Sequence, residues 1–395
     1  GSNIHKNRPL MGAISINKSR FNIDKFEESV PIIIHEIFHN LGFSKNLYKH
    51  FVNKETSIQM TKEQIRKKVD ENDQNNLFQI KEEKKEKKDK KARMIITSMV
   101  QEVAKKHFNC EALKGLVLEN EGGSGTYGSH WEARIAYNEI MAGLHSDNPV
   151  ISIFTLALFH DSGWYNVDFS KAMPLYWGKN AGCDFYINGC HSENINTEFF
   201  CKKSRENKKA CSHDKSSIGI CRSHKFADGC LIVENTKGEE CTRNQPFGTN
   251  FFNLASFDYK GETSKCFSST IGSSHFMYPV LKTENKRCQK IECTFDKSNN
   301  PIQIKIVFDS SDSIVCKEED KEKTLEYKGK TYSGEIECPI NFDIYCSGGY
   351  KKCSNLNYCT LKENLKESNG KCIFDKCFCD KGFIGEDCLK IVKTI

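Results

Sequence analysis

Two histidines and a glutamate in the segment IIIHEIFHNLGFSK have the types and the spacing of a metal-binding helix. Residues four apart lie on one face of an α-helix, so His35 and His39 can face the same ion, with Glu36 beside the first of them. Gly42 follows and is expected to end the helix in a left-handed conformation. In the extended form of this zinc motif a third histidine comes three residues after the glycine, where this chain has Lys45. The segment therefore predicts a zinc site whose third ligand comes from elsewhere.

The strongest candidate for that ligand is His130, one of 12 histidines. It ends a glycine-rich stretch, ENEGGSGTYGSH, whose backbone can turn tightly and place a side chain. Met141 follows eleven residues later, and a tight turn with a methionine beneath the metal accompanies the extended motif. Other histidines in helical or loop contexts are interpreted as ordinary surface or core residues: His50, His107, His145 and His160. Because a catalytic zinc takes three protein ligands and keeps one open position, we expect a three-histidine site.

Composition and charge argue against a nucleic-acid or nucleotide partner. A chain of 395 residues with 38% hydrophobic residues can form two or three globular domains. Much of the net charge of +6 lies in one run, KEEKKEKKDKKAR, which mixes both signs and has no aromatic residue on which a base could stack. We interpret the run as a solvated insertion and expect no nucleic-acid partner. The glycine-rich stretch does not indicate a nucleotide site, because no lysine follows it in the P-loop position.

Cysteine usage indicates the compartment. There are 20 cysteines, none before Cys110, and they recur every few residues from Cys183 onward. In an oxidising compartment such cysteines form disulfides that stabilise loop-rich segments. No CxxC pair is present, since the nearest approach is Cys377 and Cys379, so a zinc finger is excluded. No apolar run of 18 residues or more exists. We therefore expect an extracellular or cell-surface protein.

The pattern of apolar residues predicts an α+β fold with an ordered series of elements. We expect a strand in RPLMGAISIN, a helix that Pro31 opens and that carries the two histidines, and a polar, partly helical insertion over residues 60–94. An amphipathic helix over residues 95–108 and a helix over residues 131–143, after the glycine-rich stretch, complete the first part. Beyond Leu175 the periodicity fades and cysteines accumulate, which indicates a different kind of domain.

Taken together, these segments resemble the leishmanolysin family of surface zinc metallopeptidases. The matching stretches are RPLMGAISIN, HEIFHNLGFS, HFNCEALKGLVLENEGGSGTYGSHWEARIAYNEIMAG and FTLALFHDSGWYNVDFSKAMPLYWGKNAGCDF, and the resemblance covers roughly residues 8–346. It implies a metzincin-type peptidase domain of peptidase family M8 in which a long insertion, here residues 44–129, separates the glycine from the third ligand. It implies these roles: His35, His39 and His130 as zinc ligands, Glu36 as the catalytic carboxylate, and Met141 as the methionine of the turn.

Each implied role has a chemical reason. Three neutral imidazoles leave zinc its positive charge, which lowers the pKa of bound water to about 7. Glu36 can take the proton of this water and pass it to the leaving amine, while zinc polarises the scissile carbonyl. Met141 is apolar and flexible, so we expect it to form the floor of the pocket without binding the metal. The expected cofactor is Zn²⁺, and the expected partners are protein or peptide substrates.

The predicted domains are a catalytic domain over residues 1–178, a cysteine-rich domain over residues 179–337, and an EGF-like module over residues 338–395. The ending CFCDKGFIGEDC has the C-x-C and the later glycine-aromatic-x-glycine-x-x-cysteine pattern of such a module. Upstream cysteines that could belong to it are Cys338, Cys346, Cys353, Cys359 and Cys372. We expect Cys359 to pair with Cys372, and Cys379 with Cys388, and we expect no calcium site.

The resemblance has one departure. Only 34 residues precede His35, whereas leishmanolysin-like enzymes carry a larger N-terminal subdomain that includes the sheet whose edge aligns the substrate. Most of that subdomain is expected to be absent from this chain, and a polypeptide that supplies it is a candidate partner. Two functions remain open: a zinc endopeptidase, which Glu36 favours, and an adhesion or scaffold ectodomain with structural zinc. Membrane association would need an anchor that this sequence does not contain.

Overall fold

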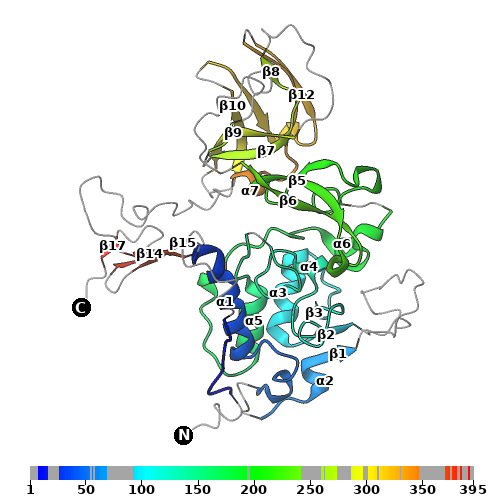
Figure 1. Cartoon of the computed structure of the whole chain (residues 1–395), viewed down its shortest axis with the longest axis vertical. Coiled ribbons are helices and arrows are strands. Elements are labelled where there is room, and N and C mark those ends of the chain that lie inside the picture. Colours follow the sequence, from blue (N-terminus) through cyan, green and yellow to red (C-terminus); the bar gives the residue numbers. More distant parts are fainter. Residues whose placement is uncertain are drawn as a thin grey trace. The chain divides into compact units, whose positions relative to one another are not determined.

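The computed structural model of the chain, drawn in Figure 1, combines helices and small antiparallel sheets in two compact units. It describes residues 8–16, 26–53, 56, 58–68, 92–146, 148–193, 196–241, 259–261, 263–273, 286–296, 301–308, 311–329, 331–346, 370–373, 376–379, 383–384 and 390–391. Unit 1 comprises Gly1–Asn207 and Cys221–Ile232, and unit 2 comprises Lys208–Ile220 and Val233–Ile395. This mixed architecture confirms the α+β class.

Unit 1 contains most of the described helices and one small sheet. Its α-helices are α1 (Phe26–Leu41), α2 (Lys62–Ile65), α3 (Ser98–Phe108), α4 (Ala133–Ala136), α5 (Ile153–Asp161) and α6 (Gly182–Ile187). Its sheet has the antiparallel order β1 (Arg66–Lys68), β2 (Arg93–Ile95) and β3 (Leu116–Leu118). Its 3-10 helices are η3 (Tyr48–His50), η4 (Phe169–Lys171), η5 (Gly189–His191), η6 (Lys203–Arg205) and η7 (Lys225–Ala227).

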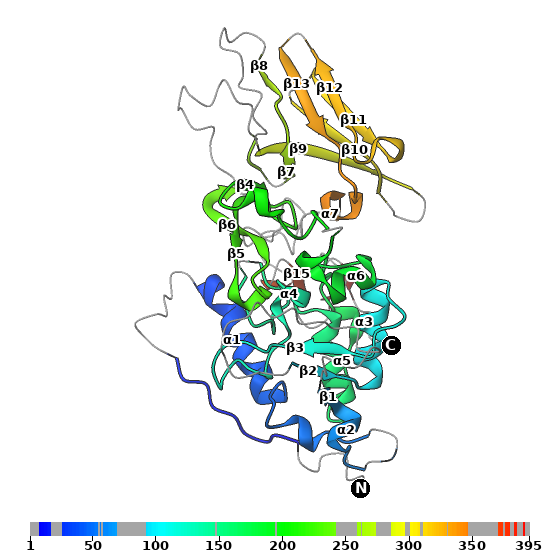
Figure 2. The same ribbon diagram turned by 90° about the vertical axis from the view of Figure 1, so that its right-hand side faces the viewer.

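The core of unit 1 forms between α3 and α5, which lie side by side in both views (Figures 1 and 2). The apolar positions of α3 recur at helical spacing, so Val100, Val103 and Phe108 are all buried on one face. Phe108 stacks on Phe154 of α5, with 5.7 Å between the ring centroids. Six of the nine residues of α5 are apolar, and Ser152 caps its start by accepting a hydrogen bond from the backbone of Phe154. Helix α5 of this core also accepts a hydrogen bond from the Trp131 indole through Thr155, next to His130.

Unit 2 is built mainly of strands. It contains a four-stranded sheet of order β11 (Ser313–Lys317), β10 (Pro301–Val307), β9 (Lys286–Phe295) and β7 (Ser264–Ser268), and a three-stranded sheet of order β12 (Thr324–Lys328), β13 (Tyr332–Glu337) and β8 (Gly272–Ser273). Helix α7 (Phe342–Cys346) is largely buried, and the 3-10 helix η9 (Glu318–Asp320) has no buried residue. Two hairpins near the end of the chain pair β14 (Gly370–Ile373) with β15 (Lys376–Cys379), and β16 (Phe383–Ile384) with β17 (Lys390–Ile391).

A further antiparallel sheet has the order β4 (Lys209–Cys211), β5 (Ser217–Ser223) and β6 (Leu231–Glu240). The boundaries of the two units fall inside β5 and β6. Because these units are defined by compactness and the predicted domains by sequence pattern, the three-domain division of the chain stays a prediction.

Several predicted elements differ from the structure. The helix that carries the zinc motif begins at Phe26, five residues before Pro31, so proline lies inside the helix and does not open it. Residues 8–16 form no strand, because they have no paired neighbour among the described residues, and Leu10 and Met11 are exposed. The helix predicted from residue 95 is confirmed as α3, with its start at Ser98 because Ile95 still belongs to β2. Most of the charged insertion lies outside the described residues.

The helix predicted over residues 131–143 is also wrong beyond the single turn of α4. The backbone of Trp131 instead pairs across the segment, donating to the Met141 carbonyl at 2.8 Å and accepting from Gly143 at 3.0 Å. The backbone of Glu139 likewise forms an isolated β-bridge with that of Val150. These tertiary hydrogen bonds compete with the helical ones, so a pattern with helical periodicity folds as a set of tight turns.

Seven disulfides hold the described parts of the chain, and each joins two cysteines of the same unit. Unit 1 has Cys110–Cys183, Cys190–Cys230 and Cys201–Cys221, and unit 2 has Cys211–Cys266, Cys241–Cys288, Cys293–Cys346 and Cys316–Cys338. Cys338 and Cys346 therefore pair with cysteines that precede the range predicted for the EGF-like module. The two pairs predicted within that module lie outside the described side chains. Across the part of the chain that the structure describes, no helix has the length and apolar character needed to cross a bilayer.

Candidate metal centre

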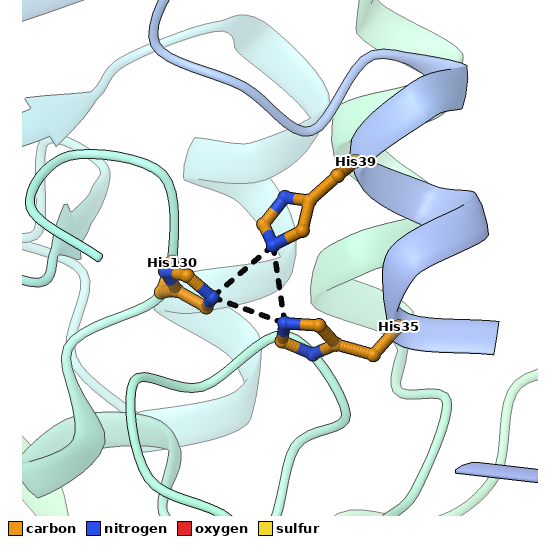
Figure 3. A group of neighbouring side chains, drawn as sticks. All are labelled: His35, His39 and His130. Atoms are coloured by element: carbon orange, nitrogen blue, oxygen red, sulfur yellow. Dashed lines mark hydrogen bonds between the residues drawn. The ribbon is translucent and has the colours of Figure 1, made fainter. Parts of the chain in front are cut away.

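Three histidine side chains from two distant parts of unit 1 converge on one point (Figure 3). His35 and His39 project from the same face of α1, as their spacing predicts, and His130 comes from the loop after β3. The Nε2 atom of His130 lies 3.0 Å from that of His35 and 3.2 Å from that of His39. The two helix histidines have Nε2 atoms 3.1 Å apart. The predicted remote histidine and the two helix histidines thus form one cluster.

Each of the three rings uses its other nitrogen on a backbone carbonyl. The Nδ1 atom of His35 lies 2.6 Å from the Ile140 oxygen, that of His39 lies 2.7 Å from the Phe43 oxygen, and that of His130 lies 3.0 Å from the Thr126 oxygen. A carbonyl can only accept, so each Nδ1 must carry the donated hydrogen. Each Nε2 then has a lone pair and no hydrogen, and the three lone pairs face one another.

This donor set fits zinc. Three lone pairs at such short separations repel unless a cation lies between them, and three Nε2 atoms bound to a tetrahedral zinc at about 2.0–2.1 Å lie about 3.3 Å from one another. The observed separations of 3.0–3.2 Å are close to that value. Hydrogen bonds from Nδ1 to carbonyl oxygens are also the usual way in which metal-binding histidines are oriented. Three protein ligands leave a fourth position for water, which is the arrangement of a catalytic site.

Burial keeps the rings in the form that binds a metal. Burial lowers the pKa of His35, and it lowers the pKa of His130 to about 3, despite hydrogen bonds that favour the charged forms. Both imidazoles are therefore neutral at neutral pH. A second group of metal-binding residue types is formed by Cys190, His191 and Cys230, but its two sulfurs are joined in a disulfide and offer no thiolate.

Lys45 stands where the extended motif has its third histidine, and it contacts the loop that carries His130. Its backbone N–H donates to the Ser129 hydroxyl at 3.2 Å, its Nζ donates to the carbonyl of Ser124, and its ammonium lies 5.8 Å from the centre of the Tyr127 ring. Lys45 therefore helps to hold the segment that carries His130.

Met141 lies in a tight turn and is fully buried. Its carbonyl accepts from Trp131, the residue after His130, and the neighbouring Ile140 carbonyl accepts from His35. The turn therefore contacts the segments of two of the three histidines through its backbone. Sequence reasoning singled out the methionine and missed these carbonyls, because a backbone oxygen carries no signal of residue type.

Glu36 and Gly42 lie on either side of the second histidine. The Glu36 side chain is exposed, as a group that must meet a substrate or solvent would be. Helix α1 ends at Leu41, and Gly42 follows with φ of 144°, a positive value that favours glycine. The turn at Gly42 brings the Phe43 carbonyl back to His39, so the predicted helix-ending glycine also places a partner of a ligand.

None of the other histidines that we dismissed belongs to a metal-binding group within the described residues. His107 is half-buried, and its Nε2 lies 2.9 Å from the Trp177 carbonyl oxygen, to which it donates. His160 lies beside Asp161 with 3.3 Å between the nearest atoms.

A helix that presents two histidines to a third from a remote loop, with a glutamate beside the first, defines a metallopeptidase type of site. The sequence profile of the leishmanolysin family, peptidase M8, matches residues 2–225. The chain belongs to the leishmanolysin family of metallopeptidases.

Individual relatives agree with this assignment. A leishmanolysin-like peptidase of Drosophila melanogaster is 30% identical over 333 residues, which cover 66% of this chain and 47% of the fly protein. One of Drosophila pseudoobscura pseudoobscura is 33% identical over 245 residues, which cover 54% of this chain and 35% of that protein. A leishmanolysin homolog of Crithidia fasciculata is 30% identical over 322 residues, which cover 75% of this chain and 45% of the relative. The chain thus spans less than half the length of these relatives.

Proposed function

We propose that this chain is a zinc endopeptidase that cleaves extended protein or peptide substrates outside the cell or at its surface. The convergence of three Nε2 atoms, each with its Nδ1 fixed on a carbonyl, carries the proposal. His35, His39 and His130 would hold the zinc. A zinc ion bound there would supply a positive charge that acidifies water and polarises the scissile carbonyl.

Glu36 would act as general base and then as general acid. It lies next to His35 on α1, and its exposed carboxylate can accept a proton from water and deliver it to the leaving amine. The Met141 turn and the Gly42 turn would keep the ligand rings in place through their carbonyls. The metzincin-type arrangement and the roles of these two residues are part of this proposal.

The proposed location and domain organisation rest on the cysteines. Seven disulfides in the described residues are typical of an oxidising compartment. They use fourteen of the 20 cysteines, which leaves Cys353, Cys359, Cys372, Cys377, Cys379 and Cys388. Six is the number that an EGF-like unit needs, so we keep such a module in the proposal, with its start after Cys346. A catalytic domain and a cysteine-rich domain would precede it.

The test compares zinc content and peptide hydrolysis in the wild-type chain, Glu36→Ala and His130→Ala. We expect one zinc per wild-type chain and chelator-sensitive hydrolysis of unstructured peptides. Glu36→Ala should retain zinc and lose hydrolysis by about 100-fold or more, because general acid–base catalysis contributes about 10²–10⁴-fold. His130→Ala should lose both, because two ligands do not form a stable catalytic site.

Each variant can contradict a different part of the proposal. Stoichiometric zinc in His130→Ala would show that this histidine is not a ligand. Equal hydrolysis by wild type and Glu36→Ala would remove the proposed role of the glutamate. Zinc without hydrolysis in the wild type would favour the alternative, an adhesion or scaffold ectodomain in which the metal is structural.

A further inference from the structure

Glu139 is a buried carboxylic acid that the proposed chemistry does not use. Only 2% of its surface is exposed. Its Oε1 atom accepts from the Thr155 hydroxyl at 2.6 Å, from the Ser152 hydroxyl at 3.0 Å and from the Ser152 backbone at 3.2 Å. Its Oε2 atom accepts from the backbone N–H of Met141 at 2.5 Å. Four donors therefore converge on one carboxyl group inside unit 1.

These donors connect the Met141 turn to α5. Ser152 is the N-cap of α5, and Thr155 lies in its first turn, so the carboxyl group bridges a helix N-terminus and a tight turn. The indole Nε1 of Trp131 also donates to the Thr155 hydroxyl at 3.1 Å, so the residue after His130 joins the same network.

The network reaches the metal-binding rings through the backbone. Ile140 lies between Glu139 and Met141, and its carbonyl accepts the Nδ1 hydrogen of His35 at 2.6 Å. Its N–H is bound to the Val150 carbonyl at 2.8 Å, so the peptide units on both sides of Ile140 are fixed. A shift of this turn would move the oxygen that sets the orientation of His35.

We propose that Glu139 is a positioning residue of the metal centre, whose carboxyl group fixes the turn that orients His35. The inference rests on the metal site proposed above. A buried carboxyl group is costly to desolvate, and an apolar residue of similar size would pack without that cost. The buried position of Glu139 is explained if one group must accept hydrogen bonds both from the Met141 N–H and from Ser152 and Thr155 of α5.

The substitution Glu139→Gln separates this role from simple packing. Glutamine has nearly the same shape, but one of its two polar ends is an NH₂ group that cannot accept. Either the Met141 N–H or the donors of Ser152 and Thr155 would then face another donor. We expect zinc affinity to fall by about 10–100-fold, the usual effect of removing a partner that orients a ligand.

The matched control is Asp161→Asn. Asp161 is another carboxylate of unit 1 with only 5% of its side chain exposed, and it accepts from the backbone of Val100 at 3.0 Å, at the start of α3. Within the described residues its hydrogen bonds go to Val100 and His160 and not to the Met141 turn. Both variants should lower the free energy of unfolding of the zinc-free chain, and only Glu139→Gln should weaken zinc.

The measurement is zinc affinity of the full chain, by competition with a chromophoric chelator, together with urea unfolding of the zinc-free protein. Thr155→Val serves as a second variant, because it removes one donor to Glu139 and the acceptor of the Trp131 indole but keeps the carboxyl group, and a smaller loss of zinc affinity is expected. The inference is overturned if Glu139→Gln and Thr155→Val bind zinc as tightly as wild type, or if Asp161→Asn weakens zinc equally.

Failure of the proposed metal site would look different. In that case the wild-type chain and His130→Ala would bind zinc equally, whatever residue stands at position 139. If wild type binds tightly, His130→Ala does not and Glu139→Gln is unchanged, then only the role of Glu139 is wrong.

Discussion

At the scale of single residues, backbone carbonyls decide the state of the site. His35, His39 and His130 each give an Nδ1 hydrogen to a different carbonyl, and this leaves their Nε2 atoms free of hydrogen. The residue types at the three acceptor positions are unrelated, since a threonine, an isoleucine and a phenylalanine supply the oxygens. The three histidine rings are therefore fixed by turn geometry, and residues that shape the turns matter as much as the histidines.

Gly42 tests this conclusion. A Cβ at this position would meet the Trp164 ring at 3.1 Å, and the φ of 144° is strained for any other residue. We expect Gly42→Ala to lower the free energy of unfolding by about 1–3 kcal/mol. The variant should also weaken zinc binding, because the carbonyl of the next residue, Phe43, orients His39. Urea unfolding and zinc competition measure the two effects.

The matched control for that variant is Gly125→Ala. An added Cβ there meets nothing within 4 Å, and the position carries no positive φ. This control should leave the stability unchanged or raise it by about 0.4–1 kcal/mol. Equal stability of the two variants would contradict the strain argument.

At the scale of elements, the core between α3 and α5 supports the loops around the site. His107 of α3 is part of this core, with its ring 4.8 Å from that of Phe154. Burial lowers the pKa of His107 to about 4, although its hydrogen bond to the Trp177 carbonyl opposes the shift. At a pH between about 4 and the ordinary pKa of about 6.5, His107 binds a proton in the unfolded chain but not in the folded chain.

The stability of the zinc-free chain should therefore fall on acidification. The contribution of His107 is fully present above the unfolded pKa of about 6.5 and is lost as the pH falls toward about 4. Between about pH 7 and about pH 5 the loss should be about 2 kcal/mol. The variant His107→Gln can keep the hydrogen bond to Trp177 without titrating, so it should lack this part of the loss. Urea unfolding with a chelator present measures it, and identical pH dependence in both proteins would contradict the assignment.

At the scale of the whole molecule, each of the two units is stabilised by its own disulfides. In unit 1, Cys110–Cys183 joins the end of α3 to α6 and closes a loop with a sequence separation of 73. In unit 2, the disulfides lie largely among strands, and Cys241, Cys266 and Cys288 form a buried cluster with Ile218. The metal centre lies entirely in unit 1.

The double variant Cys110→Ala/Cys183→Ala should lower the free energy of unfolding of unit 1 by about 2–4 kcal/mol. Zinc should then be released at a lower denaturant concentration. The control is Cys316→Ala/Cys338→Ala, which opens a disulfide of unit 2 and should leave the zinc release unchanged. Following zinc release and unfolding in the same titration tests this, and earlier zinc release in the control would show that the two units are coupled.

The sequence by itself determined the local chemistry. A spacing of four residues placed His35 and His39 on one helical face, and the apolar spacing of residues 95–108 predicted α3. The convergence of His130 on the two helix histidines could be proposed from its glycine-rich loop and from a family resemblance, and the cysteine density predicted the disulfides. These inferences succeed because they depend on residue type and short-range periodicity, which the chain carries locally.

Tertiary structure alone decided which hydrogen bonds and disulfides join the segments. The stretch from residue 131 to residue 143 has a helical pattern, but Trp131 binds the Met141 carbonyl and the Glu139 carboxyl group binds the Met141 N–H. Such hydrogen bonds join groups that are distant along the chain or depend on turn geometry. No local pattern specifies them, so the carbonyl partners of the histidines and the pairings of the cysteines became visible only in the folded chain.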